Sequence, residues 1–126
     1  MKIFEKTTST WDSKVNFVDN NDVYVGYDIE QLCFEDAGWF VADKITPYNR
    51  DESSRKEYDV EDYVFDKDFF QTVDSDALDE GCMVAFKLVS KGKPDLFLHL
   101  YNCQNGFYGH GFTVKHSGEI VDEGEL

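Results

Sequence analysis

The pair Asn105-Gly106 stands between two runs of alternating aliphatic and aromatic residues, within the stretch 96–116. A two-residue hairpin loop of type I′ needs a positive φ angle at both central positions, and Asn-Gly adopts these angles readily. The sequence therefore predicts two strands, 96–103 and 107–115, that pair as an antiparallel hairpin. We expect this hairpin to be central to the fold, because both of its faces are substantially apolar.

The predicted hairpin gathers side chains with possible coordination or catalytic chemistry on one face. Side chains alternate across a strand, so pairing across a two-residue loop places His99, Cys103 and His110 together among aromatic residues. The other face carries leucines. Gly109 and Gly111 on that face leave room for another element or a ligand to approach closely.

A second hairpin is predicted over 14–28, where apolar residues alternate with polar ones. A two-residue loop at 20–21 and a three-residue loop at 19–21 are both compatible with this pattern. We favour the three-residue loop, which pairs Phe17 with Val23, because it gathers the alternating apolar residues on one face.

The segment 28–38 fits a short helix. Asp28 suits the N-cap position, the apolar residues after it recur at helical spacing, and Gly38 suits the position after the last turn. The other segments are expected to be a polar lead at 1–13, strands at 39–42, 62–66 and 82–89, an exposed loop at 43–57, a turn or short helix at 67–72, and at 119–126 either a strand around Ile120-Val121 or a frayed end.

Composition supports a folded β protein. The chain is 41% hydrophobic and 16% aromatic, which argues against global disorder and favours strands. We predict a single compact domain, 1–126, that is mainly β, with α+β as the alternative. The expected architecture is an antiparallel meander, sandwich or half-barrel with one short helix near residues 28–38.

The three cysteines, Cys33, Cys82 and Cys103, show no spacing of a disulfide framework, so we expect reduced thiols in a cytoplasmic protein. The first residues lack the apolar core of a signal peptide. No apolar run approaches the ~20 residues of a membrane span.

Acidic residues are concentrated in the middle of the sequence. The net charge is −14, from 26 acidic and 12 basic residues, and residues 51–80 contribute most of it. This charge disfavours direct binding to nucleic acid or to an anionic membrane. It permits a basic protein surface, a cationic ligand or a metal ion, and it is also typical of a face that only confers solubility.

Three sequence patterns contain residues that could bind a metal or act in catalysis. His99, Cys103 and His110 could ligate a metal, although no fourth ligand and no Cys-x-x-Cys spacing accompany them. A nucleophilic Cys103 or Cys33 with a histidine base lacks a recognisable motif. The acidic stretch 74–81 fails the pattern of a calcium-binding EF-hand loop, because Leu78 occupies a ligand position. No cofactor is therefore predicted.

Two stretches, Lys14-Val-Asn-Phe-Val-Asp continuing to Val25-Gly-Tyr-Asp28, and Asn105-Gly-Phe-Tyr-Gly-His-Gly-Phe112, resemble an uncharacterised family of short bacterial and bacteriophage proteins. The resemblance covers the two predicted hairpins. It implies a phage or mobile-element origin, and by analogy an inhibitor of a host enzyme. The family has no known activity, so the resemblance implies no catalytic residue, and the shared residues are strand aromatics, glycines and turn residues.

The favoured hypothesis is a small, acidic, non-enzymatic binding protein that occupies a basic, nucleic-acid-binding surface of a partner protein. The residues expected to contact the partner are Asp59, Glu61, Asp62, Asp66 and Asp68. The alternatives are a metal- or small-ligand-binding domain or enzyme that uses His99, Cys103 and His110, and a domain whose ligand lies over Gly109 and Gly111.

Overall fold

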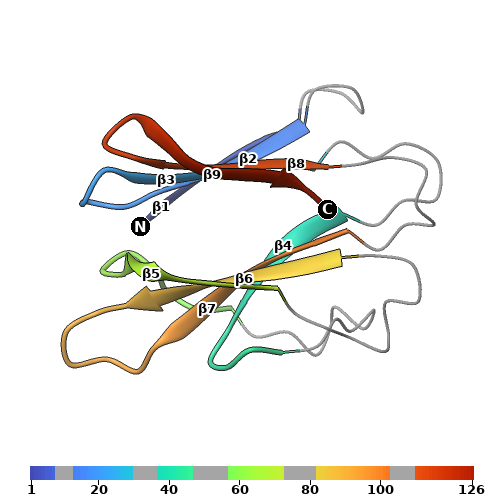
Figure 1. Cartoon of the computed structure of the whole chain (residues 1–126). Helices are drawn as coiled ribbons and strands as arrows, with labels where there is room; N and C mark the ends of the chain where they lie inside the picture. The colour runs from blue at the N-terminus through green and yellow to red at the C-terminus, as the bar shows by residue number, and fades with distance from the viewer. Residues whose placement is uncertain (8–12, 30–36, 47–56, 73–81, 103–109) are drawn as a thin grey trace.

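The structure is a computed structural model that describes residues 1–7, 13–29, 37–46, 57–72, 82–102 and 110–126. These residues form two antiparallel β-sheets that lie face to face as two layers (Figure 1). No helix occurs among them, so this part of the chain has none that is long and apolar enough to cross a membrane. The described residues are thus all-β, which confirms the mainly-β prediction in its sandwich form.

Each sheet combines strands from separated parts of the sequence. The first sheet contains, in spatial order, β1 (Lys2–Thr7), β2 (Ser13–Val18), β3 (Val23–Asp28), β8 (Gly111–His116) and β9 (Glu119–Glu125). The second sheet contains β4 (Ala37–Ala42), β7 (Leu96–Asn102), β6 (Cys82–Val89) and β5 (Val64–Thr72). The chain therefore passes from one sheet to the other after β3 and returns after β7.

Apolar side chains from both sheets fill the space between the layers. Alternation along each strand points every second residue inward, and these residues are the aliphatic and aromatic ones. The most deeply buried residues include Val15, Phe17 and Val25 of the first sheet and Leu88, Leu98 and Leu100 of the second. Burying each such side chain contributes roughly 1.5–3 kcal/mol, so this layer is the main source of stability.

A smaller apolar cluster covers the outer face of the second sheet. It contains Phe40, Met83, Ala85 and Tyr101, all of them buried. His99 points to the same outer face and is fully buried, with its ring stacked on Phe40 at a centroid distance of 4.3 Å. The second sheet is therefore covered on both faces.

The predicted pairing of 96–103 with 107–115 is wrong. β7 pairs with β4 and β6 in the second sheet, and β8 pairs with β3 and β9 in the first. The pair Asn105-Gly106 lies outside the described residues. The other half of the expected meander, β6 beside β7, is confirmed.

The hairpin over 14–28 is confirmed, but its register differs from both loops considered. Phe17 pairs with Val25, because the backbone N–H of Asp19 bonds the carbonyl of Val23 and the turn lies beyond that bond. A shift by two residues leaves every side chain on the same face. The expected burial of the alternating apolar residues is therefore confirmed.

The helix predicted over 28–38 is wrong at both of its ends. Asp28 is the last residue of β3, and Ala37 and Gly38 begin β4; residues 30–36 lie outside the described residues. Strand β1 replaces the expected polar lead, and β9 confirms the alternative of a strand around Ile120-Val121. Strand β5 continues to Thr72 through the expected turn or helix.

Candidate functional site

The edge strand β5 of the second sheet contains a pronounced β-bulge. Its register with β6 shifts between Phe65 and Phe70, so that residues 66–69 stand opposite Lys87 alone. An Asx turn supports the bulge, since the Asp66 carboxylate accepts the backbone N–H of Asp68 at 3.0 Å. Bulges redirect side chains at sheet edges, where functional sites often lie.

The edge strand β9 of the first sheet contains a second bulge. Val114 pairs with Asp122 and Lys115 with Ile120, which leaves Val121 as the extra residue. Val121 and Asp122 are neighbours in sequence and would point to opposite faces of a regular strand. Both line the same cavity here, because the bulge turns them to one side.

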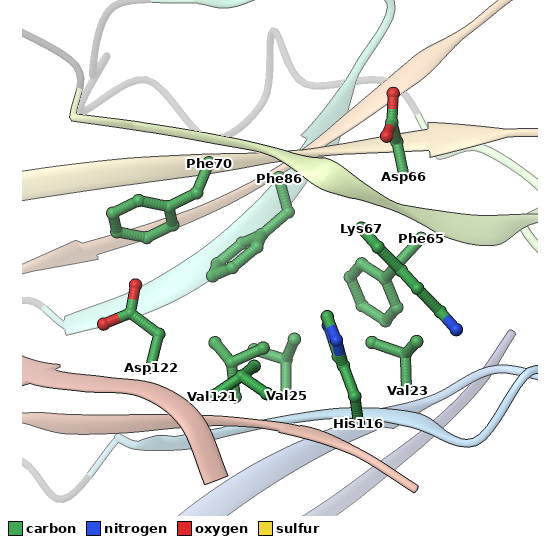
Figure 2. A pocket seen from close by; sticks show the side chains of 11 residues that line it. Val23, Val25, Phe65, Asp66, Lys67, Phe70, Phe86, His116, Val121 and Asp122 are labelled. Atoms are coloured by element: carbon green, nitrogen blue, oxygen red, sulfur yellow. The ribbon is translucent and has the colours of Figure 1, made fainter.

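An open groove of about 210 Å³ lies between these two edges. Strands β3, β8 and β9 of the first sheet line one side, and β5 and β6 of the second sheet line the other (Figure 2). The apolar lining residues are Val23, Val25, Phe65, Phe70, Phe86, Val114 and Val121. Since liquid water occupies about 30 Å³ per molecule, the groove has room for one large side chain or a small ligand.

Phe70 is the most exposed aromatic residue of the groove. Its ring lies 5.3 Å from that of Phe86 and 5.8 Å from that of Phe112, yet the side chain remains 43% exposed. Val121, on the opposite edge, is 52% exposed. Exposed apolar side chains beside a cavity are typical of a binding surface.

The polar residues of the groove lie at opposite ends. The Asp122 carboxylate lies beside Phe70, whereas Lys67 and His116 lie beside Phe65 and Val23 (Figure 2). Asp66 also borders the groove, but its carboxylate projects to the other side of β5. The groove therefore has an acidic end and a basic end, joined by an apolar floor.

The acidic segment, defined here as residues 57–68, leads into β5 and is attached to the N-terminus. The ammonium group of Met1 donates hydrogen bonds to the carbonyl oxygens of Val60, Glu61 and Tyr63, at 2.8–3.0 Å. Burial lowers the pKa of this ammonium, while the negative charge of Asp19 acts in the opposite direction.

Two further contacts fix the acidic segment. The Asp19 carboxylate, which is buried, accepts the backbone N–H groups of Asn21, Val23 and Phe65. The Tyr63 hydroxyl donates to the carbonyl of Pro94 at 2.7 Å. The backbone of the segment is thus held to the first sheet and to the connection between β6 and β7.

The five carboxylates predicted to contact a partner all lie on this segment. Asp59, Glu61, Asp62 and Asp68 are exposed, and Asp66 is half-buried. Asp62 forms an ion pair with Lys93 at 3.0 Å. The hydrogen bond from Lys93 lowers the pKa of Asp62 and raises the pKa of Lys93.

The three residues of the metal hypothesis do not share a hairpin face. His99 Nε2 accepts the backbone N–H of Thr46 at 3.0 Å, on the outer side of the second sheet. His110 Nδ1 lies 2.8 Å from the carbonyl oxygen of Asp28, in the first sheet. Cys103 lies outside the described residues. Within the described ranges, no group of three or more His, Cys, Asp or Glu residues is placed to hold a metal ion.

The expected ligand site over Gly109 and Gly111 does not coincide with the groove. Gly111 is exposed and pairs with Glu125 of β9, and a β-carbon built on it would meet only ordinary contacts. Gly109 lies outside the described residues. The groove opens instead beside Val114 and His116, further along the same strand.

No protein-family model, curated protein or solved structure matches the chain. The resemblance to short bacterial and phage proteins stays a prediction.

Sequence reasoning found the acidic segment but missed the groove. The segment 67–72 places Lys67 and Asp68 before two adjacent phenylalanines, and this pattern is compatible with a turn, a helix or a bulged strand. The Ser117-Gly118 pair, which the sequence analysis did not use, would have predicted the pairing of β8 with β9, because this dipeptide suits a two-residue hairpin loop.

Proposed function

We propose that the protein is a non-enzymatic binding protein that engages a basic surface of a partner protein, such as the nucleic-acid-binding surface of an enzyme. The observation that carries this proposal is the acidic segment, whose exposed carboxylates project from a backbone fixed by Met1, Asp19 and Tyr63. A fixed backbone reduces the entropy that must be lost on binding.

Electrostatics favours this partner class over others. The net charge of −14 repels nucleic acid and anionic membranes, and it attracts a surface that is itself built to bind phosphates. Complementary charge raises the association rate and makes it depend strongly on salt. An inhibitor of the phage type, which occupies a nucleic-acid-binding surface in place of nucleic acid, is the specific form that we propose.

The groove supplies the apolar part of such an interface. Productive interfaces combine a desolvated aromatic centre with a polar rim. Phe70 of β5 and the exposed Val121 of β9 both line the groove, and both strands carry carboxylates. The arrangement supports a contact surface along the β5 edge rather than a solvated acidic face alone.

The test is capture of partners from a bacterial lysate at low and high salt, with the affinity tag placed after Leu126 so that the Met1 ammonium stays in place. The test variant neutralises four carboxylates of the acidic segment, Asp59→Asn, Glu61→Gln, Asp66→Asn and Asp68→Asn. Asp62 is retained because it pairs with Lys93. We expect a partner that is captured at low salt, lost at high salt and lost by this variant.

The matched control changes the net charge equally at other exposed sites: Glu5→Gln, Asp22→Asn, Asp43→Asn and Glu119→Gln. Loss of the partner with the test variant and its retention with the control supports the acidic segment as the contact. Equal loss with both variants indicates attraction by net charge alone and contradicts a defined surface. A partner that resists high salt also contradicts the proposal.

A further inference from the structure

Asp122 and Phe70 lie next to each other at one end of the groove, although they come from different sheets. Figure 2 shows the Asp122 carboxylate of β9 directed toward the ring of Phe70 on β5. Because Phe70 is 43% exposed, part of its ring is accessible from the groove. A carboxylate beside an accessible aromatic ring suits a cation, which gains from the ion pair and from the negative face of the ring.

The floor behind this pair is apolar. Phe86 lies beside Phe70, and Val25 and Val121 lie together next to Asp122 (Figure 2). An alkyl chain packed against these side chains would be removed from water while its charged end reached the carboxylate. Long cationic side chains of proteins bind in this way, with a buried stem and a polar end.

The surrounding charge favours a cation at this end. Glu123 is exposed on β9 next to Asp122, and Asp68 is exposed on the facing edge strand. The positive charge of Lys67 lies at the other end of the groove, beside Phe65 (Figure 2). A cation beside Asp122 therefore enters a region of negative potential and avoids the groove's own lysine.

We propose that the groove binds an arginine side chain from a basic segment of the partner protein, with the guanidinium group at Asp122 and Phe70. The inference rests on the proposed function, since it names the chemistry of the contact that a basic partner makes. Arginine fits better than lysine, because its planar guanidinium stacks on an aromatic ring, bonds a carboxylate through two N–H groups and is less strongly hydrated.

The test uses small probes of the side chain and needs no identified partner. N-butylguanidinium carries the arginine side-chain cation, and N-butylurea has nearly the same shape without the charge. Each is titrated into the full chain while the methyl signals of Val25, Val114 and Val121 are followed by NMR. We expect N-butylguanidinium to shift these signals in a saturable manner at millimolar concentration, as befits so small a ligand. The urea should bind about fivefold more weakly or not at all.

Two variants test the assignment of the cation to Asp122 and Phe70. Asp122→Asn removes the charge with little change in shape, and Phe70→Leu removes the ring while it keeps an apolar side chain. Each should weaken N-butylguanidinium about fivefold, which matches one exposed ion pair or one cation–π contact. The control is Glu119→Gln, an exposed carboxylate on the same strand that does not line the groove; it should leave the affinity nearly unchanged.

Several outcomes overturn the inference. Equal binding of the guanidinium and urea probes shows an apolar cavity without preference for a cation. Shifts that persist in Asp122→Asn, or that appear only outside the groove, show that the cation binds elsewhere. The proposed function is tested separately, and it fails when the variant with a neutralised acidic segment captures the same proteins as its charge-matched control. If capture of a partner depends on the acidic segment but neither probe binds the groove, the proposed function is supported and the arginine site is contradicted.

Discussion

Asp19 and Phe65 connect the two sheets directly: the Asp19 Oδ2 atom, in the turn between β2 and β3, accepts the backbone N–H of Phe65, in β5, at 2.8 Å. The other carboxylate oxygen accepts the N–H groups of Asn21 and Val23 within its own turn. One buried side chain therefore closes a hairpin turn and positions the strand that follows the acidic segment.

Replacement of Asp19 should destabilise the protein. Asp19→Asn keeps one carbonyl oxygen but turns an NH₂ group toward a backbone N–H, which leaves a buried donor without its acceptor. We expect a loss of about 1–3 kcal/mol in the free energy of unfolding, measured by urea denaturation. Asn20→Ala is the control, because Asn20 is exposed in the same turn. Equal stability of the two variants would contradict the role of the Asp19 carboxylate.

An extension before Met1 should also lower stability. The Met1 side chain is only 5% exposed, and its ammonium donates to three carbonyl oxygens of residues 60–63. A preceding residue converts the ammonium into an amide with one N–H and must find a path out of a buried site. Thermal unfolding of chains with a short tag at either end checks this. We expect a lower midpoint for the N-terminal tag only; identical midpoints would show that the three bonds contribute nothing.

The turn between β8 and β9 offers a stabilising substitution. Ser117 has a φ angle of 52° and Gly118 one of 82°, so both central residues of this two-residue loop are left-handed. Asn tolerates this conformation better than Ser. Ser117→Asn should raise the free energy of unfolding by about 0.5 kcal/mol, and Ser117→Val should lower it. The reverse order in chemical denaturation would contradict the left-handed assignment.

Phe70 and Phe86 are in contact but should respond differently to truncation. Phe86 is 4% exposed in the core, so Phe86→Ala should cost about 3–5 kcal/mol. Phe70 is largely exposed at the edge of the groove, and Phe70→Ala should cost about 1 kcal/mol. Denaturation curves of both variants distinguish the roles. A cost for Phe70 as large as that for Phe86 would make it a core residue and weaken its place in the candidate site.

Local patterns in the sequence predicted the strands that alternate regularly. The strand 82–89 coincides with β6, and the inward residues of the 14–28 hairpin are the buried ones. Period-two alternation reports which face is apolar, and this holds whatever the neighbouring strand is. The same information could not show that β7 and β8 belong to different sheets, because it does not specify which strands pair.

The groove is formed by β-bulges, which a search for alternating apolar and polar residues does not detect. The bulges in β5 and β9 break the two-residue period at the residues that line the cavity, Phe65 to Phe70 and Val121 to Asp122. A bulged strand therefore resembles a turn or a helix in sequence. The acidic segment was found because charge is a property of composition and needs no knowledge of pairing.

The passage of the chain between the two sheets sets the order in which the fold can form. Strand β3 pairs with β8, for example Val23 with His116, and all strands of the second sheet lie between these two residues in the sequence. During synthesis, β3 therefore emerges long before β8 can pair with it. Until β8 is synthesised, one edge of β3 has no partner strand, and β3 carries residues such as Val25 and Tyr27 that are buried in the folded protein. Such long-range pairing is slow, and an unpaired apolar edge is prone to associate with other chains. A nascent chain of this protein is thus most vulnerable to aggregation just before its last two strands leave the ribosome.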